Sequence, residues 1–519
     1  MSSVNSNVAS WIAAHATAGP DRCAIADADR RLGYAELHAR IQRCAAVLSA
    51  AGIARGDRVA LVLGNRTAYL EVVFAAAQLG AIAVPVNARL TAHEIRHVFD
   101  DCTPKALVTD VEHRGPVQRA CELAESPPPF QLVCGGTPDA YEDALARTTP
   151  RRAVEAMSPD DAMILMYTSG TTGRPKGALL PARKTLFNCL NAERFFGLTL
   201  DDRVLVMLPL FHSFGLAILA IPALHAGARV VLQPRFDAEE VWHTVHEERI
   251  TFFGGVPTMF RRLLESLDSA PGRSCDLASL RFLFTAGSAI PVELIRDFEH
   301  RGLVLKQGYG QTETSILCCL DSRDAIRKAG SVGRPVHHVD LRVVGQAEID
   351  DEPSAWRDVA VGETGEIVVR GPITMLGYWQ RPEETAATLR GDWLRTHDLA
   401  TVDTEGFVTL VGRRNDMYIS GGENVYPAEI EAVYEEHPAV REIAVVGVPD
   451  ELWGEAGRAF VVLREGATLD VDALLAWGRE RLASFKLPRE FISSQQLPRT
   501  VTGKLQKHRL GGSQGPPGS

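Results

Sequence analysis

The chain carries its densest group of chemistry-bearing residues in the segment 167–177, which reads YTSGTTGRPKG. Three glycines, four Ser or Thr hydroxyls and two cations follow the apolar, strand-like run 163–167. A glycine-rich loop after a strand brings backbone N–H groups close to a polyphosphate, and hydroxyls and cations add further donors. The segment is not a Walker A loop, because Lys176 lies between Pro175 and Gly177 and not before a Ser or Thr. It predicts a phosphate-binding loop, with a flexible connector as the alternative.

A second motif, residues 307–313, follows another strand-like run and reads QGYGQTE. The ring of Tyr309 stands between two glycines, which leaves room for a base against its face. The hydroxyl of Thr312 can donate to a phosphate, and the carboxylate of Glu313 can hold Mg²⁺. A plain turn with a packed tyrosine is the alternative for this segment taken by itself.

Three further side chains have a type and setting that suit a nucleotide or an acid. Asp398 is a bidentate acceptor suited to ribose hydroxyls. His212, among the aromatics of 209–215, is a general base, a gate at a carboxylate pocket or a packed loop histidine. Lys504 lies beside Gly503 in a turn, from which a long cationic side chain can reach an anion, although most lysines are simply solvated.

Alternating strand and helix patterns separate these segments. The runs 58–63, 81–86 and 105–109 are strand-like, and 67–80 is helical. After the glycine loop the pattern repeats, with strand-like runs at 203–208, 228–232, 252–257 and 280–285 and a helical stretch over 216–226. Such alternation predicts a parallel sheet with helices on its faces.

The last part of the chain predicts two other architectures. Short strands with Gly turns over 339–370 indicate a small β-barrel. Helical patterns over 428–435 and 471–482 flank strand-like runs, which suits a small α+β domain. We therefore expect an α/β fold with a large N-terminal domain of parallel-sheet layers plus a small barrel, residues 1–414, a mobile α+β C-terminal cap, residues 415–510, and a disordered tail, residues 511–519.

Composition limits the classes of protein that the chain can be. With 519 residues it is too long for a single core, and 45% apolar and 23% charged residues are ordinary for a globular protein. The formal net charge of −10 argues against non-specific nucleic-acid binding. Nine scattered cysteines without metal-ligand spacing indicate reduced thiols in the cytoplasm. We find no signal-peptide pattern and no apolar run of membrane-spanning length.

In their order along the chain, these motifs resemble those of AMP-forming acyl-CoA synthetases, a superfamily that also holds nonribosomal adenylation domains and luciferase. The resemblance runs from Tyr167 to Lys504. It implies that Tyr309 stacks on adenine, that Thr312 meets the AMP phosphate and that Glu313 binds Mg²⁺. The ATP- or AMP-binding residues that it implies are Thr168, Ser169, Gly170, Thr171, Thr172, Gly173, Lys176, Gly287, Ser288, Ala289, Gly308, Tyr309, Gly310, Thr312, Asp398 and Arg413.

The resemblance also assigns residues that act on the acid. Lys504 is the lysine that enters the active site during adenylation, His212 is a gate at the acyl site, and Asn415 is the pivot of the C-terminal domain. Two positions depart from the family pattern, because His397 replaces the usual Gly and Asn415 replaces Asp or Lys. We expect the His397 side chain to face solvent. The candidate acyl-pocket residues are Phe211, His212, Ser213, Gly254, Gly255, Met259, Gly308 and Ser315.

The implied activity is that of an ATP-dependent carboxylate–CoA ligase with Mg²⁺, in which acyl-AMP forms first and CoA then displaces AMP. The pocket candidates are small or apolar, with no evident cation, which favours a fatty or aryl acid over a dicarboxylate. Alternatives are an enzyme that loads a separate carrier protein, a luciferase-like oxidase and a non-catalytic acyl-adenylate binder. A homodimer is compatible with the sequence. Candidate CoA contacts are Gly421, Gly422, Trp453 and Phe485, although simple packing is equally expected of the two aromatics.

Overall fold

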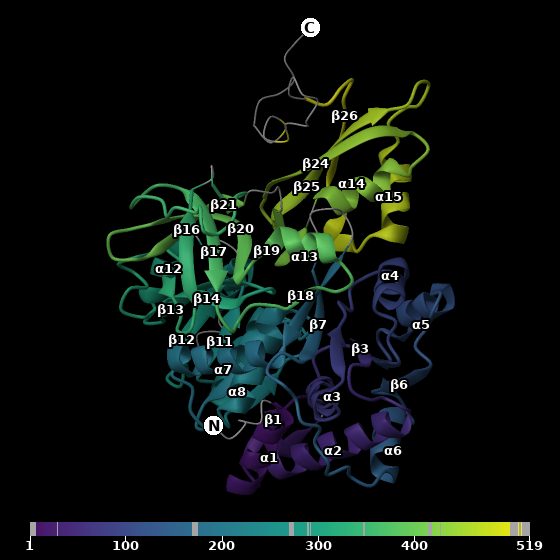
Figure 1. Ribbon diagram of the computed structural model, residues 1–519, viewed down its shortest axis with the longest axis vertical. Coiled ribbons are helices and arrows are strands. Elements are labelled where there is room, and N and C mark those ends of the chain that lie inside the picture. The colour runs from purple at the N-terminus through teal and green to yellow at the C-terminus, as the bar shows by residue number, and fades with distance from the viewer. Residues whose placement is uncertain are drawn as a thin grey trace. The chain divides into compact units, whose positions relative to one another are not determined.

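The computed structural model describes residues 7–28, 30–168, 175–268, 275–287, 290, 292–345, 348–413, 418–425, 427–498, 507 and 510 (Figure 1). The chain forms two compact units. Unit 1 comprises Met1–Ala88, Val98–Tyr167 and Gly177–Gly412, and unit 2 comprises Arg89–His97, Thr168–Lys176 and Arg413–Ser519. The tail predicted over 511–519 lies outside the described residues.

A nine-stranded sheet carries the second motif. Its central pairs are parallel, and the pairs β1–β2, β13–β14 and β14–β15 are antiparallel. In spatial order the strands are β15 (Arg334–Pro335), β14 (Ser315–Leu320), β13 (Leu305–Gln311), β12 (Phe282–Thr285), β11 (Phe252–Gly255), β9 (Arg203–Val206), β10 (Arg229–Leu232), β1 (Cys23–Ala26) and β2 (Arg31–Gly33).

A seven-stranded sheet leads into the glycine-rich loop. Its strands β7, β4, β3, β5 and β6 pair in parallel. Their buried runs of Val, Ile, Leu and Ala are typical of strands covered on both faces. In spatial order the strands are β18 (Gly377–Tyr378), β8 (Lys176–Pro181), β7 (Ala162–Thr168), β4 (Ile82–Pro85), β3 (Arg58–Val62), β5 (Ala106–Asp110) and β6 (Phe130–Cys134).

Helices alternate with these strands, as the sequence pattern predicts. The stretch 216–226 differs from an ordinary α-helix, because a π-helix, η1 (Phe214–Ala220), precedes the short α8 (Ile221–His225). The other helices of this part of the chain are α1 (Ala9–Ala18), α2 (Tyr34–Ala50), α3 (Thr67–Gln78), α4 (Ala92–Cys102), α5 (Arg114–Leu123), α6 (Ala140–Arg147), α7 (Ala182–Phe196), α9 (Ala238–Glu248), α10 (Pro257–Leu267) and α12 (Val292–Glu299).

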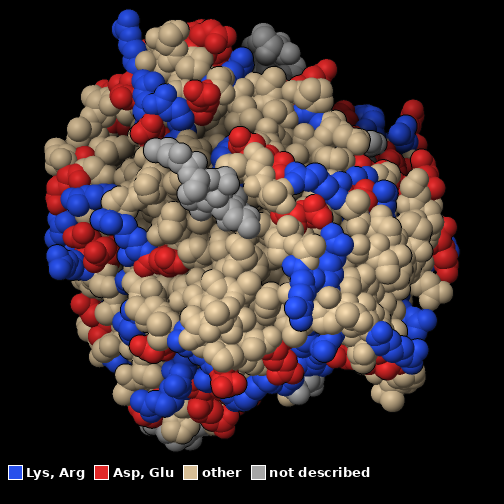
Figure 2. Space-filling model, turned by 60° about the horizontal axis from the view of Figure 1, so that its bottom comes forward, with Lys and Arg blue, Asp and Glu red and all other residues tan. Residues whose placement is uncertain are grey.

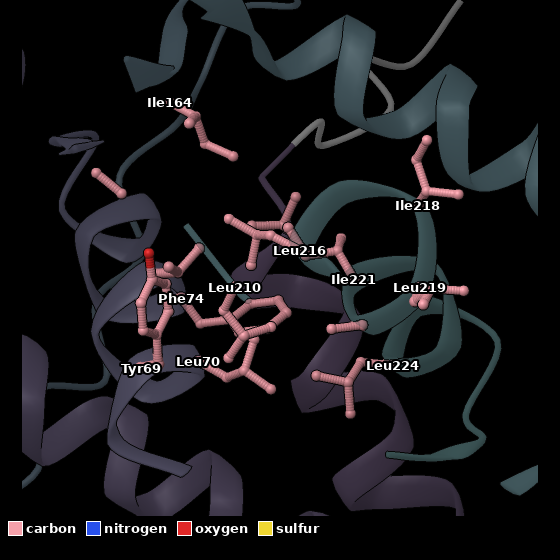
Figure 3. Close-up of a cluster of buried hydrophobic side chains, with 14 of the residues drawn as sticks. Tyr69, Leu70, Phe74, Ile164, Leu210, Leu216, Ile218, Leu219, Ile221 and Leu224 are labelled. Carbon is pink, nitrogen blue, oxygen red and sulfur yellow. The ribbon is translucent and has the colours of Figure 1, made fainter. Parts of the chain in front are cut away.

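One large core joins both sheets of unit 1 through the helices between them. Figure 3 shows Leu216, Ile221 and Leu224 of η1 and α8 directed toward Leu70 and Phe74 of α3, whereas Ile218 lies apart from that group. The residues of this cluster are almost fully buried, so η1 is held on this side by apolar contacts. This packing fixes η1, which directly follows the predicted acyl-pocket residues His212 and Ser213.

The segment predicted as a small barrel is a mainly antiparallel sheet in unit 1. Its strands are β16 (Asp340–Val344), β17 (Gly365–Arg370), β20 (Trp393–Val402) and β19 (Leu389–Arg390), with β21 (Val408–Arg413) paired to β20. Helix α13 (Pro382–Thr388) precedes β19. Strand β20 carries Asp398 and therefore positions the predicted ribose ligand.

Unit 2 contains the predicted small α+β fold. An antiparallel pair of long strands, β24 (Val440–Asp450) and β25 (Gly454–Leu463), packs against α14 (Pro427–Glu435) and α15 (Val471–Arg481) around a buried apolar cluster. The remaining elements are β22 (Tyr418–Ser420), β23 (Glu423–Val425), η2 (Ser484–Lys486) and β26 (Glu490–Ser493).

Candidate active site

The adenine and ribose ligands that the motifs predict are joined directly in unit 1. The hydroxyl of Tyr309 donates to Oδ2 of Asp398 at 2.6 Å. The amide of Gln311 donates to the same oxygen at 2.6 Å and to the carbonyl of Thr396 at 2.8 Å. Asp398 is only 4% exposed, so its carboxylate is held in place by the QGYGQTE segment itself.

The two glycines around Tyr309 allow neighbouring parts of the sheet to approach β13 closely. A Cβ on Gly310 would lie 1.8 Å from the carbonyl oxygen of Ser315, and a Cβ on Gly308 would lie 2.5 Å from the ring of Phe284. The glycines are required because β14 and Phe284 approach β13 closely.

The turn after β13 holds Glu313. The hydroxyl of Tyr378 donates to Oε1 of Glu313 at 3.0 Å, and the amide of Met375 donates to the Glu313 carbonyl at 2.8 Å. No group of three or more His, Cys, Asp or Glu side chains that could hold a metal occurs among the described residues. A single carboxylate nevertheless fits Mg²⁺ bound with a nucleotide, because that ion takes most of its ligands from phosphate oxygens and water.

The strand before the glycine-rich loop is fastened by a buried acid. Tyr167 donates from its hydroxyl to Oδ2 of Asp101 at 2.6 Å, and Arg381 donates to Oδ1 at 2.7 Å. Burial raises the pKa of Tyr167, which keeps the hydroxyl protonated as a donor. At the two ends of the loop, the hydroxyl of Thr168 donates to the carbonyl of Lys176 at 3.4 Å. The loop residues Ser169, Gly170, Thr171, Thr172 and Gly173 lie outside the described residues.

Some other predicted nucleotide ligands are described only in part. Gly287 follows β12 with φ +90°, a left-handed conformation that favours glycine. Thr312 lies in the turn between β13 and β14 and is half-buried. Arg413 ends β21, but its side chain is not among those described. Ser288, Ala289, Asn415 and Lys504 lie outside the described residues.

The predicted gate histidine stands where β9 gives way to η1. His212 packs beside Phe211 with ring centroids 4.7 Å apart, and its carbonyl accepts from the amide of Leu216. Ser213 directly precedes η1. A π-helix is rare and often occurs at functional sites, which agrees with the prediction of a substrate-facing segment.

Two aromatic rings that sequence reasoning missed stand over the predicted acyl-pocket glycines. A Cβ on Gly254 would lie 2.8 Å from the ring of Phe214. In the same way, a Cβ on Gly308 would lie against the ring of Phe284. The Phe214 and Phe284 rings meet edge to face at 5.6 Å. On the other side of β11, a Cβ on Gly255 would lie 3.2 Å from Phe260, and Met259 lies partly buried on α10. Glycine at these positions therefore leaves room for the aromatic side chains that pack against the strands.

A buried cation was also missed beside the acyl-pocket residue Ser315. Lys184, on α7, is 2% exposed, and its ammonium donates to the hydroxyl of Ser315. Burial lowers the pKa of Lys184 to about 7, against the opposing effect of the nearby Glu313 carboxylate. Ser315 has a left-handed backbone with φ +58°, a conformation that is uncommon for a residue with a side chain. Helix α7 also carries Arg183, Glu193 and Arg194, so the sequence gives no signal that Lys184 in particular is buried.

His397, expected to face solvent, is partly exposed and also lies against a buried acid. Its side chain is only 35% exposed, and Nδ1 lies 3.5 Å from Oε1 of Glu366. Glu366 is fully buried and also accepts from Arg395, at 3.0 Å and 3.1 Å. The backbone of His397 has φ +59°, which explains why glycine suits this position.

In unit 2, the predicted CoA contacts fall into two places. Gly421 and Trp453 touch, since a Cβ on Gly421 would lie 2.5 Å from the indole ring and the Gly421 amide donates to the Trp453 carbonyl at 2.9 Å. The guanidinium of Arg489 lies 5.3 Å over the same ring. Gly421 and Gly422 are both left-handed, with φ +58° and +83°. Phe485 instead packs against the apolar core of unit 2.

Comparison with known proteins gives this site a class. The chain matches the AMP-binding enzyme family over residues 12–379 and the AMP-binding enzyme C-terminal domain over residues 429–504. The chain therefore belongs to the AMP-binding enzyme family.

Three similar proteins narrow the activity. A feruloyl-CoA synthase from Amycolatopsis is 41% identical, with 97% of this chain and 98% of the relative covered. An indoleacetate–CoA ligase from Aromatoleum aromaticum is 41% identical, with 96% of each covered. The solved structure of o-succinylbenzoate CoA synthetase from Bacillus subtilis superposes with a TM-score of 0.86 at 32% identity, covering 96% of this chain and 98% of that one.

The chain is accordingly an AMP-forming acid–thiol ligase, which uses ATP and CoA and works through an acyl-adenylate. Basic and acidic groups are interspersed over the face of the molecule in Figure 2. Within the described residues, no helix is long and apolar enough to cross a membrane.

Proposed function

We propose that the chain activates an aryl or arylalkyl carboxylic acid and transfers the acyl group to CoA. The observation that carries this proposal is the pair of rings, Phe214 and Phe284, which stand edge to face over Gly254 and Gly308. Edge-to-face aromatic surfaces favour a planar ring as their next neighbour. The names of the two relatives, a feruloyl-CoA synthase and an indoleacetate–CoA ligase, support the same class of acid.

In this proposal the nucleotide is held by the joined group of Tyr309, Gln311 and Asp398. A carboxylate has about four acceptor positions, so Asp398 can accept ribose hydroxyls while Tyr309 and Gln311 fix its plane. Tyr309 then presents a ring whose hydroxyl is anchored and whose orientation is set before the base arrives. Thr312 and the loop residues 168–176 contact the phosphates, and Arg413 supplies a second ribose contact.

Glu313 is the residue that would hold Mg²⁺, with Tyr378 orienting its carboxylate. When bound, Mg²⁺ neutralises charge on the phosphates. Lys504 adds a second positive charge during adenylation, and His212 acts as a gate beside the acid and not as a base. We place Gly421, Gly422 and Trp453 along the path of CoA, with Asn415 as the pivot.

The location and assembly of the enzyme remain predictions. All nine cysteines are free, which suits the reducing cytoplasm. A homodimer is tested by light scattering of the purified chain.

The test of the function is a panel of acids assayed for pyrophosphate release and for CoA thioester formation. Benzoates, cinnamates and indoleacetate are compared with fatty acids of short, medium and long chain. We expect kcat/KM to be highest for an aromatic acid, with AMP as a product. Turnover of fatty acids alone would contradict the aryl assignment, and thioester formation on a carrier protein but not on CoA would favour the carrier-loading alternative.

A further inference from the structure

A buried polar stripe runs along one face of α7. Lys184, Asn188 and Asn191 are spaced by four and three residues, so they lie on the same side of the helix. Their exposed fractions are 2%, 1% and 2%. Three fully buried polar side chains in a row are unusual on a helix whose other buried positions are mostly small or apolar.

The middle member of the stripe shows what this face touches. The Asn188 amide donates to the carbonyl of Ala217 in η1 at 2.6 Å, and its oxygen accepts from the amide of Ile316 in β14 at 3.4 Å. The predicted acyl-pocket residues His212 and Ser213 lead into η1, and Ser315 begins β14. The stripe therefore runs between the two elements that carry the acyl-site residues.

Asn191 is the next residue along this face, and the protein leaves it without partners. Neither its Nδ2 nor its Oδ1 has a hydrogen-bond partner within the described part of the chain, although both atoms are buried. One turn further along α7, the ring of Phe195 packs against the ring of Phe284, with the ring centroids 5.9 Å apart. Asn191 thus lies on α7 between Asn188, which contacts η1 and β14, and Phe195, which contacts Phe284 of β12.

The spacing of the stripe matches the length of an aromatic acid. Asn191 lies seven positions along the helix from Lys184, whose ammonium donates to the Ser315 hydroxyl. At about 1.5 Å per residue this is roughly 10 Å along the helix. An acid that lies along α7 with its carboxylate near Glu313 would therefore place the far end of a phenylpropenoic group near Asn191.

We propose that Asn191 is a specificity-determining residue that binds a hydroxyl group at the far end of the acid. An amide oxygen and an amide N–H₂ together suit a hydroxyl, which both donates and accepts. This inference rests on the proposed aryl–CoA ligase function and adds the substituent that the site recognises. The substrate hydroxyl would supply the hydrogen-bond partner that a buried side-chain amide normally has.

The test compares kcat/KM for cinnamic, 3-hydroxycinnamic, 4-hydroxycinnamic and 4-methylcinnamic acids in the wild-type enzyme and in Asn191→Leu. Leucine has nearly the shape of asparagine but cannot form hydrogen bonds. We expect the wild type to prefer one hydroxylated acid over the unsubstituted and methylated acids by about tenfold or more, and Asn191→Leu to lose that preference. Asn191→Ser, which restores a donor and acceptor, should recover part of it.

Two further measurements keep the outcome decisive. Leu190→Ala, on an exposed position of the same helix, should leave the selectivity unchanged. Asn191→Leu should fold at least as stably as the wild type, because it removes two unpaired polar atoms. An equal preference in wild type and Asn191→Leu, or unfolding of Asn191→Leu, would overturn the inference while leaving the ligase function intact. Failure of the wild type to activate any of these acids, with fatty acids turned over, would overturn the aryl assignment and this inference with it.

Discussion

Replacing Lys184 by Met should make the protein more stable at neutral pH and change how its stability depends on pH. The ammonium of Lys184 is buried, and burial lowers its pKa from 10.5 to about 7. The unfolded chain therefore binds more protons than the folded one between these two values, and stability rises with pH across that window. Methionine has a similar length and no charge, so it removes this pH-dependent term.

The magnitude follows from the two pKa values. At about 1.36 kcal/mol per pKa unit, the span from 10.5 to about 7 corresponds to roughly 5 kcal/mol as an upper limit. Loss of the hydrogen bond to Ser315 offsets about 1 kcal/mol of this gain. We expect Lys184→Met to raise the free energy of unfolding by roughly 2–4 kcal/mol near pH 6.5, and the advantage to shrink as the pH approaches 10.

The assay is urea unfolding of both proteins at a series of pH values from 6 to 10, followed by fluorescence. Lys486→Met is the matched control, because this equally buried lysine is paired with Glu94 at 2.9 Å and Glu429 at 2.6 Å. Those carboxylates raise its pKa, so its replacement leaves unpaired buried charge and should destabilise. Parallel pH profiles for wild type and Lys184→Met would refute the reasoning about Lys184.

Three further predictions concern the proposed site. Glu313→Gln should sharply reduce pyrophosphate release at limiting Mg²⁺ and recover in part at high Mg²⁺, and an unchanged Mg²⁺ dependence would rule out Glu313 as the ligand. Lys504→Ala should nearly abolish acyl-AMP formation but spare conversion of supplied acyl-AMP to acyl-CoA, whereas Gly422→Leu should do the reverse, which separate half-reaction assays can check. His397→Gly should be more stable in urea than His397→Ala by about 1 kcal/mol, because both lose the contact with Glu366 but only Gly relieves the left-handed backbone, and equal stabilities would contradict this account.

The sequence was enough to predict the parallel sheets and the small α+β fold of unit 2. Buried parallel strands appear in the sequence as continuous apolar runs, and the helices between them show a period of about 3.6 residues. Both patterns are local, so they can be recognised without knowledge of long-range contacts. The π-helix at Phe214–Ala220 could not be distinguished from an α-helix in the sequence. Its hydrogen bonds span one residue more than those of an α-helix, but the segment is equally apolar in either form.

The motifs led to Tyr309 and Asp398, but their direct hydrogen bond joins residues 89 positions apart and has no local signal. The close approach of Phe284 and Ser315 to Gly308 and Gly310 has no local signal either, since these neighbours meet β13 only after the sheet has formed. Lys184 and Asn191 were missed because a helix pattern does not reveal which polar residues turn inward. Burial of such residues is decided by the partner surfaces, here η1 and β14.

The hydrogen bond between Tyr309 and Asp398 also has a consequence for how nucleotide preference can change. The proposed base ligand Tyr309 donates its hydroxyl to Oδ2 of the proposed ribose ligand Asp398, so neither can be altered without disturbing the other. The binding energies of the two halves of adenosine should then be non-additive. The enzyme should therefore discriminate less well between bases when the sugar of the nucleoside is modified. Drift toward a different nucleotide would require both residues to change together, which makes the adenosine preference hard to lose by single substitutions.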